Sequence, residues 1–272
     1  MQVLTMHGLR MPKLGLGTWQ MRGGACTDAV LGALGLGYRH IDTAQMYGNE
    51  AAIGAALARS DVPRADLHVT SKVWPDNLAP AALRHSLDRS LADLRTDYVD
   101  LFLIHWPKPD MDLAAALTTL AELHAEGLVR AIGVSNFPVA LMRQAIEQIG
   151  APIACNQVEY HVLRDQSKVL DYARRHGVAV AAYAPLARGR LAEHPDLQRI
   201  AGKHGATVEQ VALKWLLDQD GVAAIPKATA PARQRANLEA LTLRLDDDDR
   251  AAIAALPKDV RLVTPGWPMA WD

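Results

Sequence analysis

The chain has 272 residues, half of them hydrophobic, so it is long enough to bury the core of one large barrel or of two smaller domains. Its 29 basic and 30 acidic residues are evenly scattered and give a formal net charge of −1. That balance offers no electrostatic reason to bind nucleic acid or an anionic membrane, and a small, roughly neutral partner is expected instead.

The N-terminal segment lacks the basic and apolar regions of a secretory signal, and no apolar run approaches the length of a membrane span. The two cysteines, Cys26 and Cys155, lie far apart without metal-ligand spacing and read as reduced thiols. These features predict a cytoplasmic protein without a metal site, and a monomer is the default expectation.

In chain order, apolar runs alternate with stretches of helical spacing. Several runs follow a glycine that suits a left-handed helix end, namely Gly37, Gly127, Gly177 and Gly221. Eight runs are predicted strands, near residues 14–18, 38–42, 67–72, 99–105, 130–134, 153–158, 178–183 and 222–226. They lack strict polar alternation, which is typical of parallel strands buried on both faces.

The helices between these strands carry recognisable signals. One stripe repeats at helical intervals through Leu83, Leu87, Leu91 and Leu94. Thr207 and Gln210 resemble a capping box ahead of 211–217, and Asp246 with Asp249 can cap a helix over 251–256.

Eight strand and helix cycles in a chain of this length predict one (β/α)8 barrel over residues 1–272. A hairpin-like segment at 1–13 would precede the barrel, and a tail after Lys258 would lie over its mouth. A doubly wound dinucleotide fold is the main rival. It is disfavoured because Gly15-Leu-Gly17 lacks a third glycine and a following helix.

Four polar residues end or closely follow the early apolar runs: Asp42, Tyr47, Lys72 and His105. The carboxyl ends of barrel strands converge on one mouth, so these side chains are expected to meet there. Asp42 or His105 alone would more often be a satisfied structural group, whereas lysine is rarely buried without a partner.

The four residues make a coherent proton-transfer set. A nearby Lys72 ammonium is expected to lower the pKa of Tyr47, and Asp42 is placed to keep Lys72 protonated. His105 can donate a hydrogen bond to a substrate carbonyl. This combination predicts carbonyl reduction, with the hydride brought by another molecule.

Tryptophans cluster at the same predicted mouth. Trp19, Trp74 and Trp106 all follow strand ends, which suggests an aromatic-walled substrate pocket. Trp267 and Trp271 lie in the tail and could cover that pocket.

Five spaced motifs closely resemble the aldo-keto reductase family. They are Gly37-Tyr-Arg-His-Ile-Asp-Thr-Ala-Gln-Met-Tyr-Gly-Asn-Glu50 with Ile53-Gly54, Ser71-Lys72, Leu103-Ile-His-Trp-Pro107, Ile132-Gly-Val-Ser-Asn-Phe137, and Ile225-Pro-Lys227 with Arg233. Within the family, the short length and the ending 261–272 look most like bacterial 2,5-diketo-D-gluconate and methylglyoxal reductases.

The resemblance implies an NADPH-dependent reductase in which Tyr47 is the general acid. It implies that Ser135, Asn136 and Gln157 hold the nicotinamide carboxamide while Tyr183 stacks on the ring. The other implied cofactor contacts are Thr18, Trp19, Asp42, Pro185, Leu186, Arg188 and Gly189, with Lys227 and Arg233 at the 2′-phosphate and Asn237 at the adenine. The implied substrate pocket comprises Trp19, Tyr47, Trp74, His105, Trp106 and Trp267.

The sequence departs from the family pattern at three cofactor positions. Ala184, Ala228 and Ala236 stand where relatives often have residues that form hydrogen bonds. NADPH is still expected because two cations remain, but NADH is an open alternative.

Two further functions stay open. One is a barrel that binds NADPH as a sensor or accessory subunit with little turnover. The other is a metal-dependent hydrolase or isomerase using Asp42 and His105, for which further ligands are lacking.

Overall fold

The structure is a computed structural model of the chain, and it describes residues 2–6 and 8–272. Eight parallel strands follow one another in chain order around a single sheet. They are β3 (Leu16–Gly17), β4 (His40–Asp42), β5 (His68–Val73), β6 (Leu101–Ile104), β7 (Ile132–Ser135), β8 (Ile153–Glu159), β9 (Ala179–Tyr183) and β10 (Val222–Ala224). Each overlaps a run that the sequence predicts as a strand.

The sheet closes on itself where the first strand meets the last. Leu14 and Gly17 form parallel bridges to Ala224 and Lys227, and the Gly15 amide donates to the Ala224 carbonyl at 2.9 Å. Gly17 is required at this seam, because a Cβ there would stand 2.5 Å from a backbone oxygen of the facing strand. The predicted (β/α)8 barrel is therefore confirmed.

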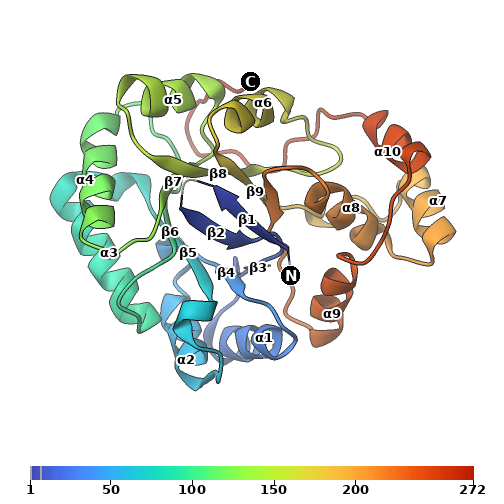
Figure 1. Ribbon diagram of the computed structural model, residues 1–272, viewed down its shortest axis with the longest axis horizontal. Helices are drawn as coiled ribbons and strands as arrows, with labels where there is room; N and C mark the ends of the chain where they lie inside the picture. Colours follow the sequence, from blue (N-terminus) through green and yellow to red (C-terminus); the bar gives the residue numbers. More distant parts are fainter. Residues whose placement is uncertain (1, 7) are drawn as a thin grey trace.

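Helices surround the barrel (Figure 1). They are α1 (Gly23–Gly35), α2 (Glu50–Arg59), α3 (Pro80–Leu94), α4 (Leu113–Ala125), α5 (Val139–Arg143), α6 (Ser167–Arg175), α7 (Pro195–His204), α8 (Val208–Leu217), α9 (Pro231–Glu239) and α10 (Asp247–Ala254). Short helical turns are η1 (Gln45–Tyr47), η2 (Arg64–Asp66), η3 (Pro75–Asn77), η4 (Gln144–Gln148) and η5 (Ala187–Gly189).

The capping signals place the helices as predicted, with one difference. Both capping boxes form, with Thr207 and Asp246 as the N-caps. The last helix is nevertheless displaced toward the N-terminus, to 247–254 instead of 251–256. The Asp246 N-cap determines where this helix starts, and Pro257 disfavours helical backbone at the residue before it.

The four glycines expected to be left-handed have φ of 104°, 81°, 65° and 72° at Gly37, Gly127, Gly177 and Gly221.

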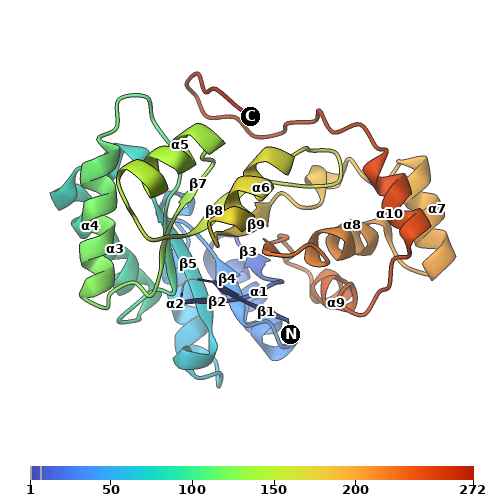
Figure 2. The ribbon, with the colours of Figure 1, turned by 45° about the horizontal axis from the view of Figure 1, so that its top comes forward.

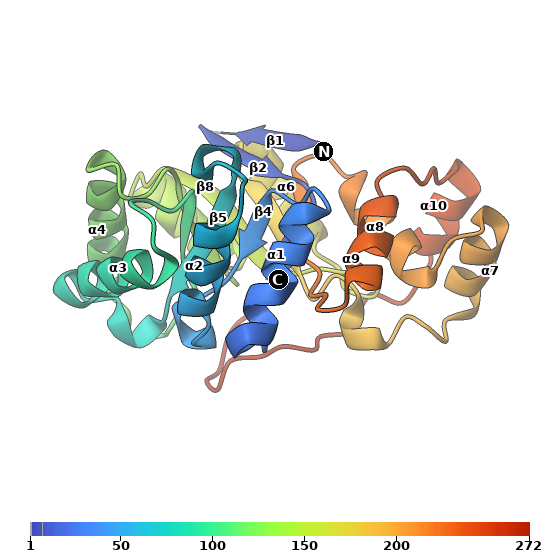
Figure 3. The ribbon, with the colours of Figure 1, turned by 90° about the horizontal axis from the view of Figure 1, so that it is seen from below.

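The N-terminal hairpin covers one end of the barrel. Its strands β1 (Val3–Met6) and β2 (Leu9–Pro12) pair antiparallel. Leu4, Leu9 and Met11 pack against inward-facing Leu103 and Ala181 in one buried cluster. Figure 3 shows this hairpin and the C-terminal tail at opposite ends of the barrel. The mouth at the carboxyl ends of the strands is therefore the end left for a site.

The tail after α10 runs across that mouth as extended chain (Figure 2). It is held there by the Trp267 indole, whose Nε1–H donates to the Pro107 carbonyl at 2.9 Å, and by Asp272, which accepts from the Val139 amide at 2.8 Å. Within residues 2–6 and 8–272, no helix is both long and apolar enough to cross a membrane.

Candidate active site

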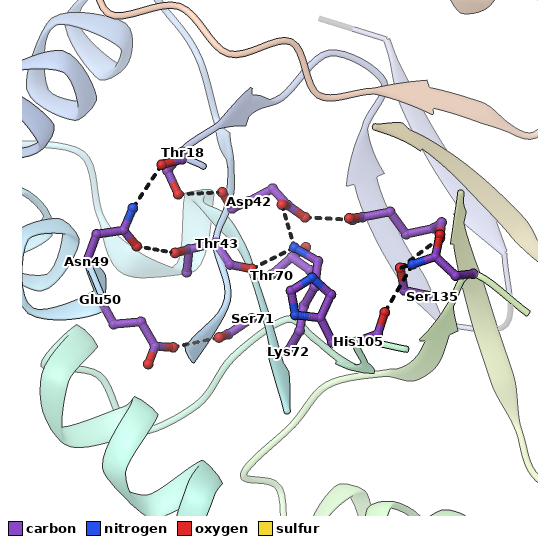
Figure 4. Close-up of polar contacts among 12 residues, drawn as sticks. Thr18, Asp42, Thr43, Asn49, Glu50, Thr70, Ser71, Lys72, His105 and Ser135 are labelled. Carbon is purple, nitrogen blue, oxygen red and sulfur yellow. Dashed lines mark hydrogen bonds and ion pairs between the residues drawn. The ribbon is translucent and has the colours of Figure 1, made fainter. Parts of the chain in front are cut away.

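The four predicted proton-transfer residues come together at the mouth. Asp42 is the last residue of β4, Lys72 lies near the end of β5, and His105 directly follows β6. Tyr47 lies in η1, the short turn that follows β4. Figure 4 shows Asp42, Lys72 and His105 on neighbouring strands.

Lys72 and Asp42 form a buried ion pair. Their side chains are 0% and 2% exposed, and Nζ lies 2.6 Å from Asp42 Oδ1. The same ammonium donates to the Thr43 carbonyl at 2.7 Å, and the Gln157 amide donates to Asp42 Oδ2 at 2.7 Å. Burial lowers the pKa of Lys72, and the Asp42 charge opposes that change. The carboxylate therefore favours the charged lysine, as predicted.

Tyr47 lies against both of its expected neighbours. Lys72 Nζ is 5.2 Å from the centre of its ring, and the His105 ring meets it edge to face at 5.6 Å. The expected direction of its pKa was wrong, however. Burial raises the pKa of Tyr47 and the Asp42 charge raises it further, so the hydroxyl keeps its proton in this structure. Burial is the larger of these two causes, and sequence spacing does not reveal it.

His105 is a neutral imidazole. It is 7% exposed, and burial together with the Lys72 charge holds its pKa well below the usual range. Its Nδ1 is buried with no hydrogen-bond partner among the described residues. An unpaired buried acceptor is more easily tolerated than an unpaired buried N–H, so the proton belongs on Nε2. That tautomer can donate to a carbonyl oxygen.

The aromatic walls are built largely as predicted. Trp74 meets the His105 ring edge to face at 5.4 Å, and Trp267 of the tail packs on Trp74 at 6.3 Å. Trp106 is buried and packs on Trp271 of the tail at 6.3 Å. Trp74 and Trp267 thus form a row of ring contacts that begins at His105.

Three residues implied to hold the nicotinamide form one hydrogen-bonded chain. Asn136 donates through Nδ2 to Ser135 Oγ at 3.0 Å and to the His105 carbonyl at 3.1 Å. The Tyr183 hydroxyl donates to Asn136 Oδ1 at 2.7 Å, and Ser135 donates to the Gln157 carbonyl at 2.8 Å. Asn136 has a left-handed φ of 64°, a conformation that asparagine tolerates better than most residues.

The loop after β9 contains three left-handed residues other than glycine. Ala184, Ala187 and Arg188 have φ of 47°, 46° and 52°, each of which stores about 1–2 kcal/mol of strain. Pro185, Leu186 and Gly189, which the family resemblance implies to be cofactor contacts, lie in the same loop. Arg188 reaches across to the Trp19 ring at 4.9 Å, and Trp19 is 39% exposed.

A cationic cluster lies at the start of α9. Lys227 and Arg233 are exposed, and no side chain among the described residues caps the N-terminus of this helix. Two cations suit a phosphate, so the residues present fit the 2′-phosphate of NADPH. Asn237 is buried and hydrogen bonds to the Tyr38 hydroxyl.

Thr18, an implied cofactor contact, donates through Oγ1 to the Asp42 carbonyl at 2.9 Å. Sequence reasoning missed two residues that shape the site, and the first is Thr43, whose carbonyl accepts from Lys72 at 2.7 Å. Glu159 ends β8 as a buried carboxylate, and it could have been found by the signal that marked His105, a polar residue at the end of an apolar run. Backbone contacts such as that of Thr43 leave no such signal.

The match to a known family is extensive. The model of the Aldo/keto reductase family matches residues 13–258. The chain belongs to this family. It is 44% identical to methylglyoxal reductase DkgB of Escherichia coli O157:H7, across 97% of this chain and 100% of that relative. It is 37% identical to glyoxal reductase of Bacillus subtilis, across 94% of this chain and 92% of the relative.

Solved structures of aldo-keto reductases share the fold along almost the whole chain. A protein described as 2,5-diketo-D-gluconic acid reductase B matches with a TM-score of 0.94 and 43% identity over 98% of both chains. The aldose reductase of Schistosoma japonicum matches with a TM-score of 0.91 and 32% identity, covering 96% of this chain and 94% of that one. The predicted family is confirmed, and so is an oxidoreductase that acts on carbonyl groups. The single domain over 1–272 and the individual site roles stay predictions.

Proposed function

We propose that the protein reduces small aldehydes and ketones to alcohols with NADPH as the reductant. The observation that carries the proposal is the buried Lys72–Asp42 pair, which lies against the Tyr47 ring beside a neutral His105. A buried ion pair is seldom retained for stability alone, so this one points to chemistry.

The chain's residues have distinct roles in this proposal. NADPH supplies the hydride when it is bound. His105 Nε2–H donates a hydrogen bond to the carbonyl oxygen, and the Tyr47 hydroxyl gives its proton to the same oxygen. Lys72 then stabilises the phenolate left behind, because its ammonium lies 5.2 Å from the ring centre. Asp42 keeps that ammonium charged.

The cofactor is proposed to lie between two groups of residues. Ser135, Asn136, Gln157 and Tyr183 would hold the nicotinamide end, next to His105 and Asp42. Lys227 and Arg233 would hold the 2′-phosphate at the uncapped start of α9. NADPH is favoured over NADH because NADH lacks the 2′-phosphate that these two cations would bind, although NADH use stays possible under the proposal.

Small aldehydes and keto-sugar acids are the proposed substrates. The relatives described above are named for methylglyoxal, glyoxal and 2,5-diketo-D-gluconic acid. On sequence grounds, the protein is proposed to work as a cytoplasmic monomer.

The deciding experiment is Tyr47→Phe. We expect this variant to keep NADPH binding, measured by fluorescence titration, and to lose methylglyoxal turnover by about 10²- to 10⁴-fold, the usual contribution of a general acid. Undiminished turnover would remove Tyr47 from its role. A barrel that only senses NADPH is not favoured, since binding alone needs neither Tyr47 nor a buried ammonium.

A further inference from the structure

Glu159 is a fully buried carboxylate that the proposed chemistry does not use. It ends β8, and its side chain is 0% exposed. Oε1 accepts from the Leu262 amide at 2.7 Å and from His161 Nε2 at 3.1 Å, and Oε2 accepts from the Val263 amide at 2.8 Å. Two of the three donors therefore belong to the backbone of the C-terminal tail.

The charge of this cluster follows from its hydrogen bonds. The Leu163 amide donates to His161 Nδ1 at 3.3 Å, so the ring proton lies on Nε2 and faces Glu159. Burial would raise the pKa of Glu159, but the bonds from His161 and the tail amides lower it overall. The cluster is thus an ionised carboxylate beside a neutral imidazole, and the carboxylate oxygens of Glu159 favour hydrogen bonds from N–H groups.

The two hydrogen bonds from the Leu262 and Val263 amides to Glu159 form a clamp on the tail. This clamp lies a few residues before Trp267. The tail first aligns with 163–165, where the Val260 amide donates to the Leu163 carbonyl at 3.0 Å. After the clamp only residues 264–266 precede Trp267, and Pro265 restricts their backbone. Trp267 then bonds the Pro107 carbonyl and packs on Trp74, which packs on His105.

We propose that Glu159 is a positioning residue that sets the place of Trp267 over the mouth, and that it thereby determines which bulky carbonyl substrates are accepted. The inference rests on the proposed carbonyl reduction. Trp267 forms a second aromatic layer beyond Trp74, so a substrate that extends past Trp74 depends on its place more than a small aldehyde held at His105 does.

The test compares methylglyoxal with phenylglyoxal, the same dicarbonyl with a phenyl in place of the methyl group. A buried hydrogen bond to a charged group is worth about tenfold or more in an equilibrium constant, so Glu159→Gln is expected to raise KM for phenylglyoxal about tenfold while kcat/KM for methylglyoxal stays within about threefold. Trp267→Ala is expected to raise KM for phenylglyoxal as well, and the double variant should match Trp267→Ala alone in its KM for phenylglyoxal. Additive effects, or an unchanged substrate ratio, would overturn the proposal.

Asp249→Asn is the matched control. Asp249 is another fully buried carboxylate, but it joins α7 to α10 through Lys203 and His204, away from the part of the tail that contains Trp267. This variant is expected to lose stability without changing the substrate ratio. If Glu159→Gln does not fold, Pro265→Gly loosens the same span and is expected to change the ratio in the same direction.

Hydrogen exchange of the Leu262 and Val263 amides tests the clamp without activity. Both amides are expected to exchange slowly in the wild type and faster in Glu159→Gln, but to stay protected in Trp267→Ala. Equal protection in wild type and Glu159→Gln would overturn the clamp. Absence of wild-type turnover with either aldehyde would instead overturn the proposed function.

Discussion

Asp42→Asn removes the only carboxylate that pairs with Lys72 in the described part of the chain. The ammonium is 0% exposed, so without its partner it is expected to lose its proton in the folded state. Neutralising a lysine of ordinary pKa 10.5 at pH 7 spans 3.5 pH units at 1.36 kcal/mol each, or about 4.8 kcal/mol. The expected loss of unfolding free energy is therefore about 3–5 kcal/mol.

The same reasoning fixes the sign of the pH dependence. Between pH 7 and 10.5 the folded variant binds one proton fewer than the unfolded chain, so its stability rises with pH by about 1.36 kcal/mol per unit. At pH 9 only 1.5 units remain, and the loss is expected to shrink to about 2 kcal/mol.

Urea unfolding followed by far-UV circular dichroism at pH 7, 8 and 9 measures these values. Lys72→Met and the double variant complete the cycle. The double variant is expected to be more stable than Asp42→Asn, since no lysine has to lose its proton on folding, yet to lack turnover. A loss that does not vary with pH, or a double variant less stable than Asp42→Asn, would refute the reasoning.

Further outcomes are expected at sites away from this pair. Arg233→Ala should weaken NADPH binding about tenfold or more while sparing NADH, and the neighbouring Arg235→Ala should spare both; equal losses for the two cofactors would place Arg233 off the 2′-phosphate. Burial lowers the pKa of three histidines: His40, His68 and His105. The unfolded chain then binds more protons below the ordinary pKa of 6.5, so stability should fall as pH drops from 6.5, by up to about 4 kcal/mol per unit for three protons. Unfolding curves at pH 7.5 and 5.5 check this, and equal midpoints would contradict it. Gly54→Ala should destabilise by about 1–3 kcal/mol, because its Cβ would stand 2.2 Å from a backbone oxygen of α3. Gly35→Ala should not destabilise the fold, because nothing lies within 4 Å of the added Cβ. Thermal melts of the two variants compare their stabilities.

The strands and the meeting of Asp42, Tyr47, Lys72 and His105 at the mouth could be predicted because both depend on local signals. Strands buried on both faces need continuous apolar runs, and a polar residue that ends such a run must lie at the mouth. Lys72 was the strongest of these signals, since a lysine at a buried strand end needs a partner. Asp42 is the partner that the structure supplies, at 2.6 Å.

The pKa of Tyr47 could not be predicted in the same way. Its direction depends on how much solvent the phenol loses and on which neighbouring charge acts on it more strongly. The sequence shows that Lys72 and Asp42 are near, but not that burial is the largest cause or that the Asp42 charge raises the pKa in the same direction. The raised pKa is consistent with a proton donor all the same, because an acid must hold its proton until the substrate oxygen becomes basic.

The role of the tail was the least predictable part of the site. Tryptophan content suggested a lid, but the tail has neither the period of a helix nor that of a strand, so no pattern specifies its path. Its path is instead specified by contacts with distant residues: two amides at Glu159, one indole at Pro107 and one carboxylate at the start of α5. Each contact is a single hydrogen bond or a pair, so each can change by one substitution without disturbing the barrel. If Glu159 places Trp267 as proposed, substrate range can vary through the tail while Asp42, Tyr47, Lys72 and His105 stay unchanged, and Glu159 is then the residue to vary when selectivity is in question.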